Sequence, residues 1–377
     1  MQALFWLSLI GFLYSYAVYP MLLLCLPKRT RQTRPVADSE LPLVTLIITA
    51  RNEAARIRHK LGNALAIDYP RDKLQILIAS DCSSDDTDNI VCEFGSHGVR
   101  LVRAEERKGK EYAQYLAVQA AAGDIVVFSD VGTDIPDDAI RIVAETFTDH
   151  GVGAISSEDR FVSQDGKVAG EGLYVRYEMW LRKLESDVNS LVGLSGSFFA
   201  VRRSLCQEWD ITVPSDFTCA LNSARHGYAA VTEPRMLGYY RDIKDPGREY
   251  ERKVRTVIRG ITAVAALPVV LNPFRLGLFA FQVWSHKIMR WATPWFIIFL
   301  LASNVAVAGA GVFYAVSLIG QLAAYGLVVW GWLVPSMRDH SLVKVPYFFV
   351  QVNLAMAHAA IAFALGKRIT MWTPSAR

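Results

Sequence analysis

Acidic and small polar side chains follow three apolar stretches of the chain, in positions where they could act together. One group contains Ala50, Asn52 and Glu53, the second begins at Asp81, and the third begins at Asp130. Carboxylates accept hydrogen bonds from a nucleotide base or a ribose, and they ligate the hard cations that bind a diphosphate. The same residue types also cap helices and shape turns. We favour binding for Asp81 and Asp130, which come first after their apolar stretches.

Other familiar chemistries are disfavoured. The sequence has neither a GxGxxG after the first apolar stretch nor a GxxxxGK[ST] segment, which argues against dinucleotide dehydrogenases and P-loop enzymes. A net charge of +4 is too small to indicate nucleic-acid binding. The 5 cysteines are irregularly spaced without a CxxC pair, which favours reduced thiols over zinc or disulfides.

A further acid, Asp216, lies among apolar neighbours in the segment V-P-S-D-F. A carboxylate in such surroundings can serve as a general base that takes a proton from a reacting hydroxyl. Alternatively, Asp216 caps the helix predicted over 217–227. The residues alone leave both roles open, and the same choice between site and cap applies to Ser83, Ser84 and Asp85.

Four arginines recur at helical spacing and would share one helix face: Arg248, Arg252, Arg255 and Arg259. Guanidinium groups suit phosphate oxygens, so the row could bind a leaving diphosphate. Attraction to anionic lipid is the alternative, and both roles can hold at once. We expect Arg252 to serve the site and Arg259 the lipid.

The elements that must position these residues alternate between strands and helices. Short connections between them predict an α/β fold with a mainly parallel sheet covered on both faces. Ligands of such sheets bind beyond the carboxyl ends of the strands, where Asp81 and Asp130 lie. The predicted strands are 43–50, 74–80, 99–103 and 125–128, and the predicted helices are 54–66, 86–94, 109–122 and 137–147.

Several long stretches of the chain are apolar enough to lie in a membrane. Of the 377 residues 52% are hydrophobic and only 20% are charged, and the charge is unevenly distributed. Ala3–Leu26 has no Asp, Glu, Lys, Arg or His and is followed by basic residues, which predicts an anchor with the middle of the chain in the cytoplasm. Trp291–Pro335 predicts two helices that turn near Gly309–Gly311, and Leu276–Arg290 predicts an amphipathic helix on the membrane surface.

The last apolar run, Val345–Gly366, fits the charge pattern less well. If it spans the membrane, Lys367 and Arg368 fall outside, against the positive-inside rule. Either this run lies in the membrane interface or forms a re-entrant segment, or the positive-inside rule fails at the C-terminal end of the chain.

In order and spacing, the motifs resemble those of membrane-bound family 2 glycosyltransferases, the superfamily of cellulose, chitin and hyaluronan synthases. The resemblance covers about residues 40–290. The matching segments are Ala50–Glu53, Asp81 in SDCSSDDT, Arg107–Lys110, Asp130, Gly193–Arg203, Ser215-Asp216 and Glu249–Lys253.

The resemblance implies a GT-A fold and transfer, with inversion, from a UDP-sugar. It implies a catalytic role for Asp216 and Arg252, and a metal-binding role for Asp130 toward Mg²⁺ or Mn²⁺. The implied nucleotide-binding residues are Ala50, Asn52, Glu53, Asp81, Lys110 and Asp130. The implied acceptor-binding residues are Gly193, Ser195 and Gly196, and those for the diphosphate are Arg252, Lys253 and Arg255.

Two motifs depart from the family pattern. The metal motif DxD reads Asp130-Val131-Gly132, as in a cellulose-synthase-like bacterial subgroup, with Asp134 two residues further on. The helix motif QxxRW has Glu249 in place of glutamine, and it has Lys253 in place of the tryptophan that helps to hold the acceptor sugar in processive synthases. The second departure favours single or limited transfer over long-chain polymerisation.

We therefore expect five segments: an N-terminal transmembrane anchor (1–27), a GT-A domain (38–247), basic and amphipathic interfacial helices (248–290), C-terminal transmembrane helices (291–366) and a tail (367–377). The expected protein is a multi-pass protein of the bacterial inner membrane with its catalytic domain in the cytoplasm.

The function that we expect is transfer of a sugar from a nucleotide-sugar donor to a membrane-associated acceptor, in cell-envelope or exopolysaccharide synthesis. Its partners would be the donor, a lipid-linked or glycan acceptor, the bilayer and other polysaccharide-assembly subunits, but no nucleic acid. The alternatives are a non-catalytic membrane scaffold that binds sugar nucleotides and a processive polysaccharide synthase.

Overall fold

The computed structural model describes residues 1–162, 173–241 and 246–369, and these form two compact units. The sheet unit contains Leu26–Lys244 and Ala263–Ala280. The helical unit contains Met1–Cys25, Asp245–Thr262 and Phe281–Arg368. Most of the predicted tail lies outside the described residues, as do the side chains of Arg248 and Glu249.

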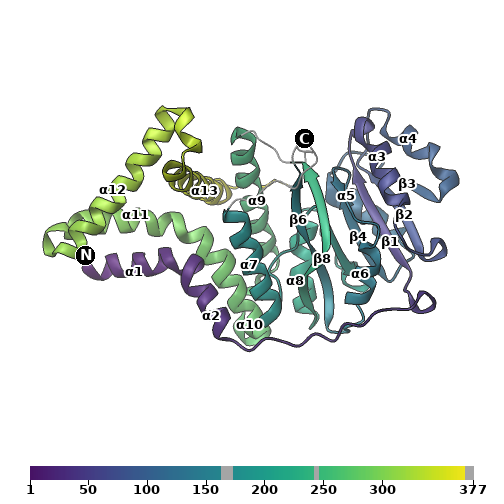
Figure 1. Ribbon diagram of the computed structural model, residues 1–377, viewed down its shortest axis with the longest axis horizontal. Coiled ribbons are helices and arrows are strands. Elements are labelled where there is room, and N and C mark those ends of the chain that lie inside the picture. The colour runs from purple at the N-terminus through teal and green to yellow at the C-terminus, as the bar shows by residue number, and fades with distance from the viewer. Residues whose placement is uncertain (163–172, 242–245, 370–377) are drawn as a thin grey trace. The chain divides into compact units, whose positions relative to one another are not determined.

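The sheet unit is built on a mixed sheet with the strand order β3-β2-β1-β4-β7-β6-β8-β5 (Figure 1). The strands β1, β2, β3 and β4 run parallel, whereas β7 runs antiparallel to both β4 and β6. The strand bounds are Val44–Ala50 (β1), Leu74–Ser80 (β2), Val99–Arg103 (β3), Ile125–Asp130 (β4), Thr133–Asp134 (β5), Val152–Val162 (β6), Phe198–Arg202 (β7) and Ala229–Arg241 (β8).

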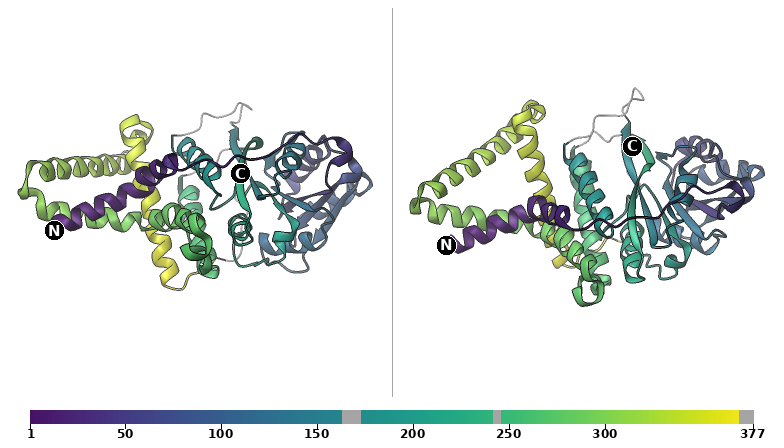
Figure 2. Two further views of the ribbon diagram at one scale, coloured as in Figure 1. Left: turned by 90° about the horizontal axis from the view of Figure 1, so that it is seen from below. Right: turned by 60° about the horizontal axis from the view of Figure 1, so that its bottom comes forward.

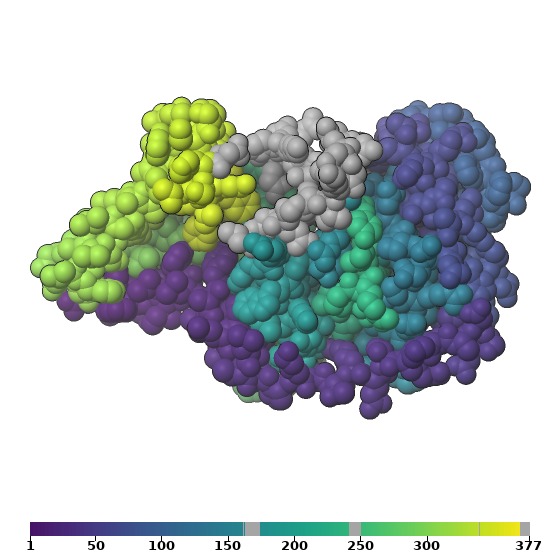
Figure 3. Space-filling model, in the orientation of Figure 1, coloured from purple at the N-terminus to yellow at the C-terminus, as the bar shows by residue number. Residues whose placement is uncertain are grey.

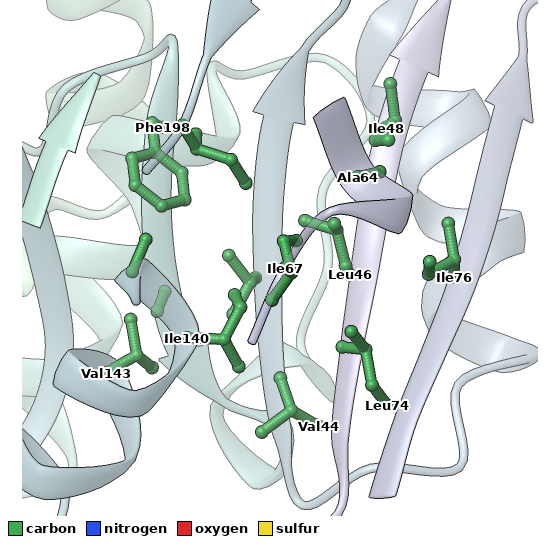
Figure 4. Close-up of a cluster of buried hydrophobic side chains, with 14 of the residues drawn as sticks. Val44, Leu46, Ile48, Ala64, Ile67, Leu74, Ile76, Ile140, Val143 and Phe198 are labelled. Atoms are coloured by element: carbon green, nitrogen blue, oxygen red, sulfur yellow. The ribbon is translucent and has the colours of Figure 1, made fainter. Parts of the chain in front are cut away.

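Both faces of the sheet are covered by helices, as predicted. On one face, alternate side chains of β1 pack with Ala64 of α3 and with Ile140 and Val143 of α6 (Figure 4). On the other face, Ile47 of β1 joins a cluster that includes Ala117 of α5. Every residue of β1 is buried, so this strand is the centre of the domain. The helix bounds are Ala54–Leu65 (α3), Thr87–Glu93 (α4), Lys110–Gln119 (α5), Ala139–Thr146 (α6), Leu173–Val188 (α7) and Ser215–Arg225 (α8).

The four predicted strands are confirmed, with ends that differ from the prediction by at most a few residues. The other half of the sheet was not predicted. Its strands β6, β7 and β8 pair across long sequence separations, and β6 changes register against β8 in two places. Such pairing leaves little mark in a local hydrophobic pattern.

The segment that leads into β1 lies on the surface of the sheet unit (Figure 3). Lys28 Nζ contacts the Asp187 carboxylate at 3.1 Å, and Arg31 Nη2 donates to the carbonyls of Ser186 (2.9 Å) and Asn189 (3.0 Å). Cationic groups stabilise the carbonyl end of a helix such as α7. The basic residues after the first apolar run therefore also hold the chain to the domain.

In the helical unit α1 (Gln2–Leu13) and α11 (Met289–Val307) run side by side (Figure 2). Among the described residues, four helices are long and apolar enough to cross a membrane: Gln2–Cys25, Pro273–Ala310, Val312–Leu333 and Ser341–Ala364. The predicted division of the second apolar run into two helices, α11 (Met289–Val307) and α12 (Val312–Leu333), is confirmed. The fourth is α13 (Ser341–Ala364).

The predicted amphipathic stretch 276–290 differs from the expected surface helix. Helix α10 (Pro273–Val283) continues through a π-helical turn, Trp284–Ile288, into α11. The polar side chains of Gln282, His286 and Arg290 are buried rather than exposed. They lie near the π-helical turn of the N-terminal helix, where Tyr14 and Ser285 share a hydrogen bond of 3.0 Å and the Arg290 guanidinium lies 4.8 Å from the ring centre of Tyr16.

Lys60 of α3 gives the sheet unit a pH-dependent stability. The side chain is fully buried and donates hydrogen bonds to Asn63 Oδ1 and to the carbonyl of Thr133. Burial lowers the pKa of Lys60 to about 7, although Asp134 and Asp130 act in the opposite direction. Between that pKa and the ordinary value of 10.5, the unfolded chain binds a proton that the folded chain lacks. The contribution of Lys60 to stability therefore rises with pH across this window.

We predict that Lys60→Met removes this pH dependence, which is at most about 1.4 kcal/mol per pH unit. Relative to wild type, the variant gains most at pH 7, and its advantage shrinks toward pH 10. Denaturant unfolding followed at several pH values measures the difference, with the exposed residue in Lys183→Met as the control. A difference between Lys60→Met and wild type that is constant with pH contradicts the assignment.

Candidate active site

The ends of β1, β2 and β4 meet at one edge of the sheet because these strands are parallel neighbours. Ala50 pairs with Ser80, and Thr49 pairs with Asp130. Asp81 N donates to the carbonyl of Ala50 at 3.0 Å. The three groups of polar residues singled out in the sequence therefore lie close together.

The loops after β1 and β2 are tied to each other. Asn52 and Cys82 both have a φ of 52°, the left-handed region that costs a non-glycine residue about 1–2 kcal/mol. Asn52 Oδ1 accepts the Ser84 N–H at 2.8 Å, and Arg51 Nη1 donates to the Asp81 carbonyl at 2.8 Å. Strained backbone of this kind is concentrated at functional sites.

Other acids in these loops make contacts within the protein. Asp85 accepts the backbone N–H groups of Ala54 and Thr87, each at 3.1 Å, so it caps α3 and α4. Glu53, which was predicted to bind nucleotide, has a buried carboxylate paired with Arg56 Nε at 2.8 Å. These contacts fix the shape of the strand-end loops.

Asp81 joins the end of β2 to the start of α5. Its side chain is fully buried, and Oδ1 accepts the N–H groups of Lys108 (3.1 Å) and Gly109 (3.0 Å). Oδ2 has no hydrogen-bond partner within the part of the chain that the structure describes. A buried oxygen left in this state costs about 1–3 kcal/mol. It is therefore a ready acceptor for an N–H group of a ligand.

Lys110 joins three segments through one ammonium group. Its Nζ lies 2.6 Å from Asp130 Oδ1, at the end of β4, and 2.9 Å from the carbonyl oxygen of Gly196. The side chains of Lys110 and Asp130 are only 9% and 19% exposed. At low exposure such a pair is screened less by water and salt than a surface ion pair.

Asp216 lies on the other side of Gly196. It is half-buried at the start of α8, and a Cβ built on Gly196 would lie 3.1 Å from Asp216 Oδ2. The carbonyl of Asp216 also accepts the Leu194 N–H at 3.3 Å. The candidate base, Gly196, Lys110 and Asp130 thus form one continuous set of contacts.

The loop 193–197, predicted to bind the acceptor, is shaped by Asp159 on β6. Ser195 Oγ donates to Asp159 at 2.6 Å, so the Ser195 hydroxyl is engaged within the protein. Sequence reasoning missed Asp159, which lies beyond a register change in its strand, and it also missed His59 and Lys60 near the end of β4. No motif in the sequence marks these three residues.

A divalent cation has one carboxylate to bind at the end of β4. Gly132 has no side chain, and the Asp134 carboxylate is 2.9 Å from His59 Nε2. Among the described residues, no group of three or more His, Cys, Asp or Glu side chains could hold a metal ion. Magnesium is commonly bound by one or two carboxylates together with substrate phosphates. Asp130 alone therefore fits only a cation that binds together with a diphosphate.

The basic residues predicted to bind the diphosphate are on α9 (Pro246–Ala266), in the helical unit. Lys253 Nζ lies 5.7 Å from the ring centre of Phe348 on α13. Burial lowers the pKa of the Arg255 guanidinium, and the charges of Arg259 and Arg252 lower it further. Crowding of like charges on one helix face is a feature of anion-binding surfaces.

Comparison with known proteins identifies the class. Residues 45–209 match the family Glycosyl transferase family 2. These residues are thus similar to a family 2 glycosyltransferase domain, and the GT-A fold expected from the sequence is confirmed. A mannosyltransferase, PcManGT from Pyrobaculum calidifontis, solved in complex with GDP-Man and Mn²⁺, has a TM-score of 0.76 at 22% identity, covering 97% of this chain and 99% of that chain.

Two curated relatives are similar in sequence. Beta-monoglucosyldiacylglycerol synthase of Trichormus variabilis is 24% identical over 206 residues, 52% of this chain and 44% of the relative. Poly-beta-1,6-N-acetyl-D-glucosamine synthase of Staphylococcus aureus is 24% identical over 225 residues, 57% of this chain and 54% of the relative. The chain thus matches about half the length of these relatives.

We predict that Asp81→Asn weakens binding of a nucleoside diphosphate about 10–100-fold. The amide oxygen of asparagine still accepts the two backbone N–H groups, but its NH₂ group replaces the Oδ2 acceptor. The loss corresponds to a hydrogen bond to a charged group, about 1.5–3 kcal/mol. Titration calorimetry with UDP and with GDP measures it.

The matched control is Asp72→Asn, at an exposed position just before the start of β2, at the opposite end of that strand from Asp81. If Asp81→Asn binds both nucleotides as tightly as wild type, the base does not contact Asp81.

Proposed function

We propose that the chain is an inverting glycosyltransferase that moves a sugar from a nucleotide-sugar donor to a membrane-associated acceptor. The observation that carries the proposal is the set of contacts from Asp130 through Lys110 and Gly196 to Asp216. It brings a fixed positive charge, suited to a leaving diphosphate, close to a carboxylate suited to act as a base.

The donor that we propose is a UDP-sugar. The imide N–H of uracil would donate to Asp81 Oδ2, and the diphosphate would lie near Lys110 and Asp130. Guanine also presents an N–H donor on its pairing edge, so the contact with Asp81 by itself does not select the base. A divalent cation bound with the donor would have Asp130 as its protein ligand and would neutralise diphosphate charge.

In the proposed reaction Asp216 takes the proton from an acceptor hydroxyl. That oxygen attacks the anomeric carbon from the face opposite the nucleotide, and a new C–O bond forms. The bond between the anomeric carbon and the diphosphate oxygen breaks, and the diphosphate leaves with the electron pair. Fixed positive charge at the leaving group is commonly the largest contribution to such catalysis. We assign it to Lys110 on the sheet unit. From the sequence, Arg252, Lys253 and Arg255 stay proposed as further diphosphate-binding residues.

The acceptor that we propose is held at the membrane. The four apolar helices support this proposal, and so does the name of one curated relative, a synthase of a glucosyl diacylglycerol. The acceptor hydroxyl would reach Asp216 past the loop that contains Gly193, Ser195 and Gly196. Localisation in the bacterial inner membrane, with the sheet unit in the cytoplasm, belongs to the same proposal.

We predict that Asp216→Asn lowers the rate of nucleotide release from the donor by about 10²–10⁴-fold, the usual contribution of a positioned base. Purified protein is assayed with UDP-, GDP- and dTDP-sugars, with and without Mg²⁺ or Mn²⁺, in lipid vesicles that supply acceptors.

The control for this experiment is Asp210→Asn, an exposed acid in the loop before α8. Undiminished release by Asp216→Asn removes the catalytic role of that residue. If the wild-type protein binds a nucleotide but releases none from any donor, the non-catalytic scaffold is the better description.

We predict that Arg252→Ala weakens nucleoside diphosphate binding about tenfold or more, because a charge-assisted hydrogen bond to phosphate is lost. Arg259→Ala, on the same helix face, leaves this affinity unchanged and instead weakens binding to anionic vesicles. Calorimetry and vesicle flotation measure the two effects. Equal losses of nucleotide affinity in both variants contradict the division of roles.

A further inference from the structure

The Asp159 carboxylate receives hydroxyl groups from both sides of Gly196. Ser195 Oγ lies 2.6 Å from Asp159 Oδ1 and 2.7 Å from Oδ2, and Ser197 Oγ lies 2.9 Å from Oδ1. Ser157 Oγ is a further neighbour at 3.3 Å. Hydrogen bonds to an ionised carboxylate are shorter and stronger than those between neutral groups. Asp159 is therefore the central acceptor of this cluster of serines.

The strand geometry explains why side chains, rather than backbone hydrogen bonds, connect β6 to the loop 193–197. The antiparallel pairing of β6 with β7 ends at Ser156 and Phe199, and the register of β6 against β8 changes between Ser156 and Glu158. Such irregularities redirect side chains next to active sites. Beyond Ser156 the connection to the loop is made by side chains, since Ser195 N donates to Ser156 Oγ at 2.7 Å and the Asp159 contacts follow.

The segment held by Asp159 also forms the middle of the candidate active site. Ser197 presents its carbonyl to Asp130 N at 2.9 Å, Gly196 presents its carbonyl to Lys110 Nζ at 2.9 Å, and the α-carbon of Gly196 faces Asp216. Rotation of this segment would move the acceptor side of the site relative to Asp216. A displacement of about 1 Å can cost an enzyme on the order of 10²-fold in rate.

We propose that Asp159 is a positioning residue that acts through Ser195 and Ser197 to hold Gly196 between Lys110 and Asp216. The proposal rests on the proposed transfer reaction and names the residue that sets the geometry of its acceptor side. Asp159 takes no proton from the substrate in this account.

The test compares Asp159→Ala with Asp159→Asn. In Asp159→Ala we expect kcat for nucleotide release to fall about 100-fold, while the Kd for UDP or GDP stays within about threefold of wild type. Asp159→Asn keeps an oxygen acceptor for the serines, so its loss of kcat is smaller, about tenfold. Glu158→Gln, which alters the neighbouring acid paired with Arg160 at 2.8 Å, is the matched control.

A second set of variants removes the serine hydroxyls. Ser195→Ala combined with Ser197→Ala should reproduce the loss in Asp159→Ala, and adding Asp159→Ala to this pair should cost less than a further threefold. This non-additivity is expected when residues act through one contact. The serine pair also tests the proposal if Asp159→Ala fails to fold.

Hydrogen exchange separates this proposal from the proposed function because it needs no turnover. The amides of 193–197 should exchange at least about tenfold faster in Asp159→Ala than in wild type, whatever the donor. Unchanged exchange overturns the positioning role, as does unchanged kcat in an enzyme whose wild type is active. A parallel loss of kcat and nucleotide affinity, or a further tenfold loss in the triple variant, would assign Asp159 a direct contact with substrate instead.

Discussion

One buried ammonium group holds the strand-end site together. Lys110 binds the Asp130 carboxylate and the Gly196 carbonyl, so it connects the start of α5, the end of β4 and the loop before β7. Asp81 fixes the same end of α5 from the side of β2 by accepting the N–H groups of Lys108 and Gly109. These contacts are at least partly buried. Loss of one of them would therefore leave a charged side chain without its hydrogen-bond partner.

Two parts of the sheet contribute different groups to the candidate site along one edge. Buried strands β1, β2 and β4 form the rigid support, and the side chains that follow them provide acceptors and a fixed positive charge. The loop before the antiparallel strand β7 brings Gly196 to Asp216. The proposed transfer needs both parts, since the donor and the acceptor must meet in one geometry.

The sequence predicted the parallel half of the fold well because its strands are short, apolar and bounded by helices with a clear period. Asp81 directly follows β2 and Asp130 is the last residue of β4, so the apolar pattern was enough to place both at strand ends. The sequence left open whether Asp85 binds a ligand or caps a helix, and it did not show the pairing of Glu53 with Arg56, because both contacts depend on where neighbouring loops lie. Asp159 was not predicted because its hydrogen-bond partners, Ser195 and Ser197, are 36 and 38 positions away in the sequence.

The most direct test of this account is a structure of the chain with a bound nucleoside diphosphate, determined by cryo-electron microscopy in lipid nanodiscs. We predict that an N–H group of the base lies within about 3.2 Å of Asp81 Oδ2, with the diphosphate beside Lys110 and Asp130. Nucleotide bound instead in the cavity of about 440 Å³ at the other end of β4, lined by Gln119, Asp124 and Arg203, would contradict it.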